Sequence, residues 1–268
     1  MLELEHGFRV VDVHVELEPD DARRPRDAGA PEQVEREMHQ AGVVRALVFP
    51  GSRDGGYLKA NNAVARVSVG RSFVALARIN GARDAGAGPG SRIRNLTASR
   101  EDHHTSPADV EQYAYDDRFA GFKLHPRVDG LPDEAVLEEL ESVGLPVVTH
   151  GGRGYPPASI AETLLEYDFP LVVSHFGGYP LQGELMDEAI DLLDSYDDYY
   201  LDTSFVRLRD PLERAVIEHP DRVLFGSGAP ASHPNVAIME ILTLDVPEDA
   251  MRKVFTNNPE RVIEELAP

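Results

Sequence analysis

Eight short apolar runs recur along the chain, and each is followed by a segment with the spacing of an amphipathic helix. Short runs rich in β-branched and aromatic residues indicate buried strands, and apolar residues three and four positions apart indicate helices packed on them. This alternation favours a parallel sheet, because parallel strands need a crossover connection. The predicted strands are Phe8–Val15, Val43–Phe49, Phe73–Ile79, Phe119–Leu124, Pro146–Thr149, Leu171–Ser174, Tyr199–Asp202 and Val223–Phe225.

The predicted helices often begin with proline, which is favoured in the first helical turn. They are Pro31–Ala41, Tyr57–Val69, Pro107–Tyr115, Pro132–Val143, Pro157–Tyr167, Glu184–Ser195, Pro211–Glu218 and Pro234–Leu242. Eight strand–helix units predict an α/β fold, a distorted (β/α)8 TIM barrel that forms a single domain over residues 1–268. A doubly wound open sheet is the alternative, but it needs a Gly-rich phosphate loop after the first strand, and none follows Val15.

Three further segments complete the predicted organisation. Glu18–Ala30 and Gly81–Ser106 are long loops at the strand ends that carry chemistry in a barrel, where they serve either as lids or as flexible insertions. The tail, Pro247–Pro268, is predicted to form a C-terminal helical extension of two short helices, with the second beginning after Pro259.

The charge balance limits the partners of this chain. Asp and Glu number 47 against 26 Lys and Arg, a net charge of −21, and only Lys59, Lys123 and Lys253 are lysines. Such an acidic, lysine-poor surface resembles that of halophilic proteins, in which salt screens the repulsion. It argues against nucleic-acid binding, which needs a basic surface. No apolar run reaches the ~18 residues of a membrane span and no signal peptide opens the chain, so we expect a cytoplasmic protein without membrane contact.

Polar residues interrupt the first strand in a regular pattern. Asp12, His14 and Glu16 alternate with valines, so we expect all three side chains on one face. Burying three polar groups together is costly unless each has a partner, and a bound metal ion is the simplest one. Since the chain has no cysteine, a metal site must use His and carboxylate ligands.

Histidine follows the apolar core of four predicted strands: His14, His125, His150 and His175. Each alone is compatible with a hydrogen-bonded core histidine. Because parallel strands in a barrel end at the same face, we expect the four rings to converge there, where neutral imidazoles can hold a divalent ion.

These motifs resemble the amidohydrolase superfamily, in particular its amidohydrolase-2 group of metal-dependent hydrolases and decarboxylases. The resemblance rests on Asp12–Glu16, Gly121–Pro126, the Thr-His-Gly-Gly around His150, the Ser-His-Phe-Gly-Gly around His175, and Leu224–Pro230, in that order. It implies a (β/α)8 fold, a small-molecule substrate and a divalent metal ion, zinc or alternatively manganese. It also allows a homodimer, as is frequent among relatives.

The resemblance implies that His14, Glu16, His150 and His175 are the metal ligands. Two positions depart from the group's pattern. Glu16 stands where the second histidine of a His-any-His motif is usual, although Glu is a competent ligand for zinc or manganese. Gly228 stands where the eighth strand normally supplies an Asp that binds the metal and moves a proton.

The missing carboxylate leaves the proton acceptor open. Asp202, at the end of the seventh predicted strand, and Glu16 are the candidate catalytic residues, whereas a helix cap or loop hydrogen bond is the alternative for Asp202. His233 lies just beyond Pro230 and is a weaker candidate.

Three residues are candidates for substrate binding. Arg153 follows His150 in a Gly-rich loop, where it could clamp a carboxylate or form a plain surface ion pair. Lys123 lies on an apolar strand, as a structural or site residue, and His125 ends that strand. The sequence thus predicts a metal-dependent hydrolase of a small carboxylate-bearing molecule. A decarboxylase of the same fold, or a non-catalytic member that binds a metal or ligand, is the alternative.

Overall fold

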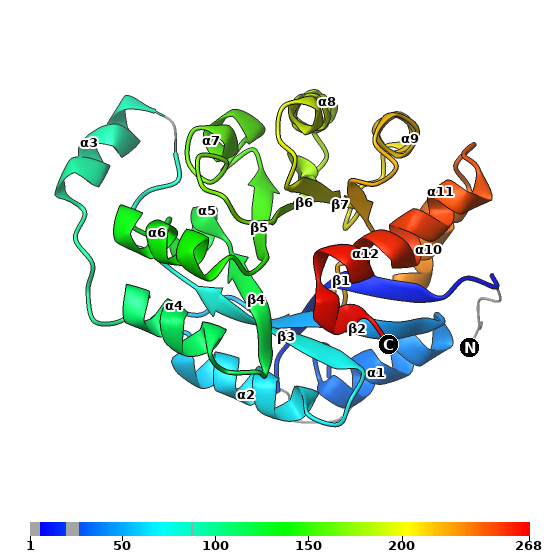
Figure 1. The fold of residues 1–268 in the computed structure, drawn as a ribbon, viewed down its shortest axis with the longest axis horizontal. Coiled ribbons are helices and arrows are strands. Elements are labelled where there is room, and N and C mark those ends of the chain that lie inside the picture. The colour runs from blue at the N-terminus through cyan, green and yellow to red at the C-terminus, as the bar shows by residue number, and fades with distance from the viewer. Residues whose placement is uncertain (1–5, 20–26, 87) are drawn as a thin grey trace.

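The computed structural model describes residues 6–19, 27–86 and 88–268, and it places eight parallel strands in the order β1 to β8 around a barrel (Figure 1). The predicted (β/α)8 fold is therefore confirmed, with all eight predicted strands present. Their bounds are β1 Val10–Leu17, β2 Val43–Pro50, β3 Phe73–Ile79, β4 Phe119–Leu124, β5 Val147–Gly152, β6 Leu171–Tyr179, β7 Tyr199–Asp202 and β8 Val223–Leu224.

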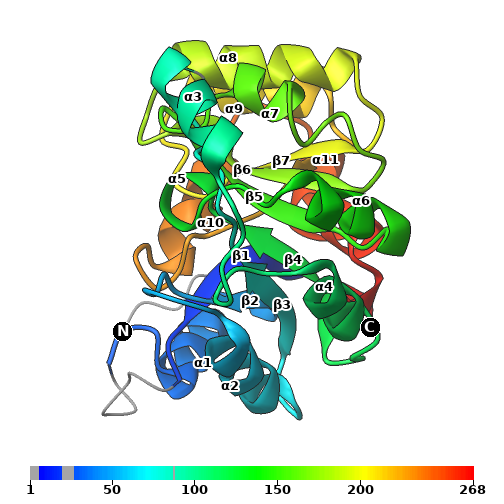
Figure 2. The same cartoon turned by 90° about the vertical axis from the view of Figure 1, so that its left-hand side faces the viewer.

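The helices lie outside the barrel, with α1 and α2 on one side and α7 to α9 on the other (Figure 2). They are α1 Pro31–Gln40, α2 Leu58–Ser68, α3 Pro89–Thr97, α4 Pro107–Ala114, α5 Pro126–Asp129, α6 Glu134–Val143, α7 Pro157–Ala161, α8 Gly183–Asp191, α9 Arg209–Glu218, α10 Pro234–Leu242, α11 Glu248–Arg252 and α12 Asn258–Val262. A 3-10 turn, Leu192–Asp194, extends α8.

Several helical segments differ from the prediction. The long segment 81–106 contains α3, which the sequence pattern did not reveal, and α5 adds a single turn after β4. Helix α7 ends at Ala161, where turns replace the predicted helix up to residue 167, and α12 begins at Asn258 rather than after Pro259. Most of the predicted loop 18–30 lies outside the described residues.

Backbone hydrogen bonds join the first strand to the segment that follows the last one. The Val13 N–H donates to the Phe225 carbonyl at 2.9 Å, and the Glu16 N–H donates to the Ala229 carbonyl at 2.8 Å. These bonds bring the ends of β1 and β8 together, so the residues that follow β8 lie beside His14.

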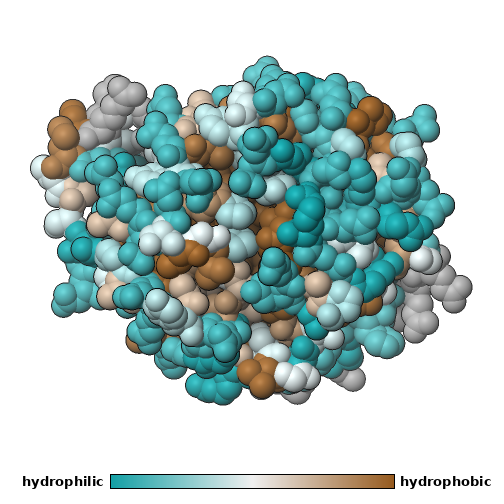
Figure 3. Space-filling view, in the orientation of Figure 1, coloured by the Kyte–Doolittle hydropathy of each residue, from teal (hydrophilic) through white to brown (hydrophobic). Residues whose placement is uncertain are grey.

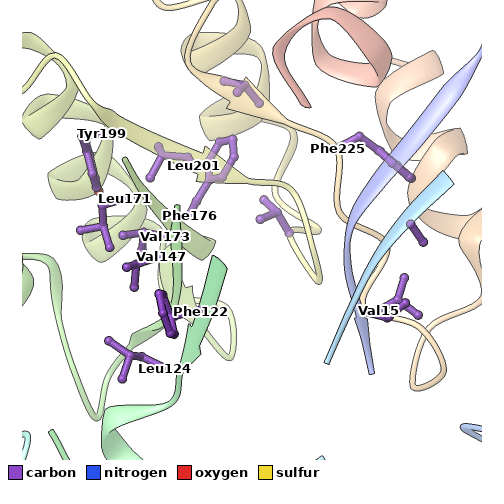
Figure 4. Close-up of a cluster of buried hydrophobic side chains, with 14 of the residues drawn as sticks. Val15, Phe122, Leu124, Val147, Leu171, Val173, Phe176, Tyr199, Leu201 and Phe225 are labelled. Atoms are coloured by element: carbon purple, nitrogen blue, oxygen red, sulfur yellow. The ribbon is translucent and has the colours of Figure 1, made fainter. Parts of the chain in front are cut away.

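Two apolar layers are built from alternate residues of the strands. The inner layer fills the barrel, with side chains from every strand: Val11, Val13, Leu47, Phe49, Leu76, Ala120, Val148, Val172, Tyr200 and Leu224. The outer layer packs between strands and helices and includes Val15, Phe122, Val147 and Phe225 (Figure 4). Polar residues dominate the surface over these layers (Figure 3).

The prediction that Asp12, His14 and Glu16 share one face of the first strand is wrong for Asp12. Val11 and Val13 lie in the inner layer whereas Val15 and Leu17 lie in the outer one, and the pairing with β2 shifts register between Asp12 and Val15. His14 therefore faces the barrel axis, and Asp12 faces away from it. Asp12 Oδ1 accepts the backbone N–H groups of His14 at 3.0 Å and Ser227 at 2.9 Å, so this carboxyl ties β1 to the segment after β8.

The C-terminal tail closes the end of the barrel opposite the strand-end histidines. Its Val262, Ile263 and Leu266 join the inner layer, and the Asn258 side chain donates to the carbonyls of Pro220 and Val223 at 2.8 Å, at the start of β8. The predicted C-terminal helical extension is thus confirmed, and it closes this end of the barrel. Among the described residues, no helix is long and apolar enough to cross a membrane.

Candidate active site

The four strand-end histidines meet at one end of the barrel. The His125 and His150 rings stack with their centroids 3.9 Å apart, His150 contacts His175 at 4.5 Å, and His175 contacts His14 at 5.0 Å. Burial is the main reason why the pKa of each of these histidines is lowered, to about 3 for His125 and His175. All four rings are therefore neutral near pH 7 and present lone pairs.

Asp202 holds His14 in one orientation. His14 Nδ1 lies 2.9 Å from Asp202 Oδ2, and Asp202 is fully buried at the end of β7. Burial alone would raise the pKa of Asp202, but its interactions with His14, His175 and Ser204 outweigh burial and lower that pKa below its usual range. The carboxylate thus accepts the Nδ1–H of a neutral His14, and this leaves the His14 Nε2 lone pair free.

A second set of contacts orients His175 and His150. His175 Nδ1 lies 2.9 Å from the Ser204 carbonyl, which can only accept, so the Nδ1 of this ring carries the proton and its Nε2 carries the lone pair. That Nε2 lies 3.0 Å from His150 Nδ1. Two ligand atoms bound to one zinc ion at about 2.0–2.1 Å are separated by a similar distance, so the two nitrogens fit the same ion.

The full predicted ligand set is not assembled. The described residues include no group of three His, Asp or Glu side chains placed to hold a metal ion. Glu16 is half-buried, and its Oε1 would lie 2.9 Å from a Cβ on Gly51, above the end of β2. The oriented nitrogens of His14, His150 and His175 nevertheless have the donor chemistry of a metal site, including oxygen acceptors behind two of the rings. Coordination by the four residues stays a prediction.

Phe205 occupies the space of the missing carboxylate. Gly228 has φ +75°, and a Cβ at this position would lie 2.6 Å from Cε2 of the Phe205 ring. That ring contacts the His175 ring, with centroids 5.4 Å apart. His233 does not restore the function, because its ring accepts the Asn235 N–H and caps α10.

A cavity of about 620 Å³ opens beside the histidines, at the ends of β4, β5 and β6. Its wall includes Arg153, His125, Arg127, His150, Tyr155 and Tyr179, and the role of Arg153 and His125 in substrate binding stays a prediction. A second cavity, of about 530 Å³, lies between the 81–106 segment and α6 and contains none of the four histidines. The first cavity is therefore the candidate substrate pocket.

A family model described as amidohydrolase, of the amidohydrolase-2 type, matches residues 11–264. The chain belongs to the amidohydrolase-2 family. No curated protein matches its sequence.

Solved structures share the fold of this amidohydrolase-2 chain at low identity. A 2,6-dihydroxybenzoate decarboxylase from Rhizobium is 13% identical, with a TM-score of 0.69 and coverage of 97% of this chain and 100% of the other. A probable 2-pyrone-4,6-dicarboxylic acid hydrolase from Acinetobacter baumannii with bound citric acid is 14% identical (TM-score 0.62; 96% and 100%). A dihydroxybenzoic acid decarboxylase from a Polaromonas species, with bound manganese, is 12% identical (TM-score 0.63; 97% and 98%).

Lys123 does not line the pocket of this amidohydrolase-2 barrel. Its side chain is buried inside the barrel, where Nζ donates to Ser174 Oγ at 3.2 Å and lies 4.7 Å from the centre of the Phe49 ring. Burial lowers the pKa of Lys123 to about 7, although the nearby Asp202 carboxylate opposes this shift. This buried position of Lys123 fits a structural residue, which is one of the two alternatives given above for it.

Lys123→Met is expected to stabilise the protein at pH 7 by about 1–4 kcal/mol, because it removes a buried charge and keeps the volume. Since the pKa of Lys123 is about 7 when folded and 10.5 when unfolded, only the unfolded state is protonated between these values, and wild-type stability rises with pH there. Urea unfolding from pH 7 to 10 should show this rise in wild type and in the exposed-lysine control Lys59→Met, but a smaller rise in Lys123→Met. An equal rise in Lys123→Met would contradict the assignment.

Several residues around the site escaped the sequence analysis. Ser204 and Phe205 follow β7, and Tyr179 ends β6, at positions without a recognisable motif. Arg78 on β3 is buried, pairs with Asp129 at 2.8 Å and donates to the Pro50 carbonyl at 3.0 Å. The sequence signal for these contacts of Arg78 was an arginine inside an apolar strand. The contacts connect the end of β3 with the end of β2 and with the segment after β4.

Proposed function

We propose that the chain is a hydrolase of a small carboxylate-bearing molecule, bound in the cavity beside His125 and His150. The observation that carries this proposal is the position of Arg153 in the wall of the same cavity as the histidines. A guanidinium can bind a carboxylate through two parallel hydrogen bonds. This would hold the substrate with its reacting bond over the histidines.

Arginine binding favours hydrolysis over decarboxylation of the bound carboxylate. Decarboxylation removes the charge from that group, so a guanidinium stabilises the ground state more than the transition state and slows the step. In hydrolysis of a bond elsewhere in the molecule, the carboxylate stays charged and its binding energy is retained. Decarboxylation remains the second candidate because two of the similar folds above are named as decarboxylases.

Each residue of the site has a role in this proposal. A divalent ion, zinc or manganese, held by His14, Glu16, His150 and His175 would supply the Lewis acid that lowers the pKa of a water molecule. Asp202 is too deeply buried to reach a substrate, so it orients His14 rather than accepting the proton. Glu16 is our candidate proton acceptor, because its carboxylate forms no hydrogen bond with other described side chains and lies at the open end of the barrel.

Protein purified without chelator is expected to contain about one equivalent of zinc or manganese. His150→Ala should lose most of this metal, because it removes one of the two nitrogens that face each other, whereas His39→Ala, an exposed histidine of α1, should retain it. Elemental analysis of the folded proteins measures both. Folded wild type without any metal would refute the metal-dependent mechanism.

A paired activity assay separates the reactions. Proton release from carboxylate-bearing esters and lactones, or amine release from carboxylate-bearing amides, reports hydrolysis, and CO2 release from aromatic carboxylic acids reports decarboxylation. The hydrolase proposal predicts activity with at least one of the first group and its loss in Arg153→Gln. CO2 release alone would establish the second candidate, and inactivity of a metal-loaded protein on both panels would favour a non-catalytic member.

A further inference from the structure

The charge pattern of the candidate pocket differs from that of the rest of the chain. Acidic residues outnumber basic ones, and most of the described arginines form an ion pair with Asp or Glu: Arg9, Arg53, Arg71, Arg78, Arg94, Arg100, Arg118, Arg207, Arg209, Arg214, Arg222 and Arg252. Arginines without an ion pair are thus the minority among the described residues, and two of them, the exposed Arg127 and Arg153, lie in one pocket.

Arg127 and Arg153 both lie in the wall of the pocket, and neither guanidinium forms an ion pair or hydrogen bond with a described residue. No Asp or Glu is among the described residues of that wall. The other titratable side chains there are Tyr155, Tyr179, His125 and His150, and burial lowers the pKa values of the two histidines. The wall thus carries two positive charges that the described chain does not neutralise locally.

The backbone is shaped to let Arg127 reach this position. A Cβ on Gly154 would lie 2.6 Å from Cδ and 2.8 Å from Cγ of Arg127. The aliphatic stem of Arg127 therefore crosses the space over Gly154, next to Arg153. The two arginines come from different segments, α5 after β4 and the turn that follows β5, and both line the same pocket.

We propose that Arg127 and Arg153 form one anion subsite that selects substrates with two carboxylates. Each guanidinium offers a planar fork that matches one carboxylate, so a dicarboxylate uses both forks. A monocarboxylate leaves one of the two charges without a counter-charge inside the pocket. The subsite assigns dicarboxylates as the substrate class of the proposed hydrolase, and in that respect it rests on the proposed function. Binding of a dicarboxylate can nevertheless be measured without turnover.

Titration calorimetry with isophthalate and benzoate tests the subsite, since the two ligands share a ring and differ by one carboxylate. Wild type is expected to bind isophthalate at least about 10-fold more tightly than benzoate. Arg127→Gln and Arg153→Gln should each weaken isophthalate binding by about 10- to 100-fold and abolish most of this preference. Arg66→Gln, which removes an exposed arginine of α2, is the matched charge control and should leave the preference intact.

Gly154→Ala tests the geometry without changing the charge. Its methyl group should displace the Arg127 stem and weaken isophthalate binding, with little effect on benzoate. Three results would overturn the proposal. Wild type binds isophthalate and benzoate with equal affinity, wild type binds sulfate as tightly as isophthalate, or Arg66→Gln weakens isophthalate binding as much as Arg127→Gln and Arg153→Gln do. If isophthalate binds as expected but no hydrolysis is found, only the proposed hydrolase activity falls.

Discussion

Gly228→Asp is expected to destabilise the protein by roughly 2–5 kcal/mol and not to raise hydrolysis, although it introduces the carboxylate that the sequence resemblance implies for this position. The new Cβ would lie 2.6 Å from the Phe205 ring, and Gly228 has φ +75°, a conformation that disfavours any side chain. The close contact with Phe205 and the unfavourable φ both arise from the Cβ of residue 228, wherever its carboxylate lies relative to the histidines. Urea unfolding and the hydrolysis panel measure the two outcomes.

A double-mutant cycle separates the two sources of strain. Gly228→Ala adds the Cβ without charge and should lose nearly as much stability as Gly228→Asp. Phe205→Ala should offset part of the loss when it is combined with Gly228→Asp, with a coupling free energy of about 1–3 kcal/mol, because it removes the ring that the Cβ meets. A Gly228→Asp variant as stable as wild type would show that Phe205 moves away at little cost.

Asp202→Asn is expected to lower metal affinity, and with it turnover, by about 10- to 100-fold. The carboxylate accepts the His14 Nδ1–H at 2.9 Å, and it also accepts the backbone N–H groups of His175 at 3.1 Å and Ser204 at 2.9 Å. An amide keeps only one accepting oxygen. If that oxygen serves the two backbone groups, the NH2 faces His14 and forces the proton from Nδ1 to Nε2, which removes the lone pair that faces the site.

The tautomer change gives this prediction a readout that loss of stability alone does not produce. Ring nitrogen shifts in ¹⁵N-histidine NMR should show the Nδ1–H form of His14 in wild type and the Nε2–H form in Asp202→Asn. Asp198→Asn, an exposed site just before β7, is the control and should change neither the tautomer nor the metal content. An unchanged His14 tautomer in Asp202→Asn would show that Asp202 does not act through this ring.

The sequence by itself determined the barrel and the end of it at which the four histidines gather. Valine-rich runs such as Val43–Phe49 have to be buried, and the repeated strand–helix order leaves few ways to do so. Parallel strands of a barrel end at one face, so the histidines in the C-terminal parts of β1, β5 and β6 and directly after β4 had to approach one another there. Arg153 was found for the same reason, because it follows one of these strand ends.

Only the tertiary structure decided how these groups contact their partners. The register shift that turns Asp12 away from the axis, the contact of Asp202 with His14 across 188 residues and the ring of Phe205 over Gly228 all depend on long-range pairing. A local pattern reports whether a segment is buried, but not which side chain from another strand or loop fills the space beside it. The presence of Arg127 and Arg153 in one pocket wall likewise depends on how the segments after β4 and β5 pack beside each other.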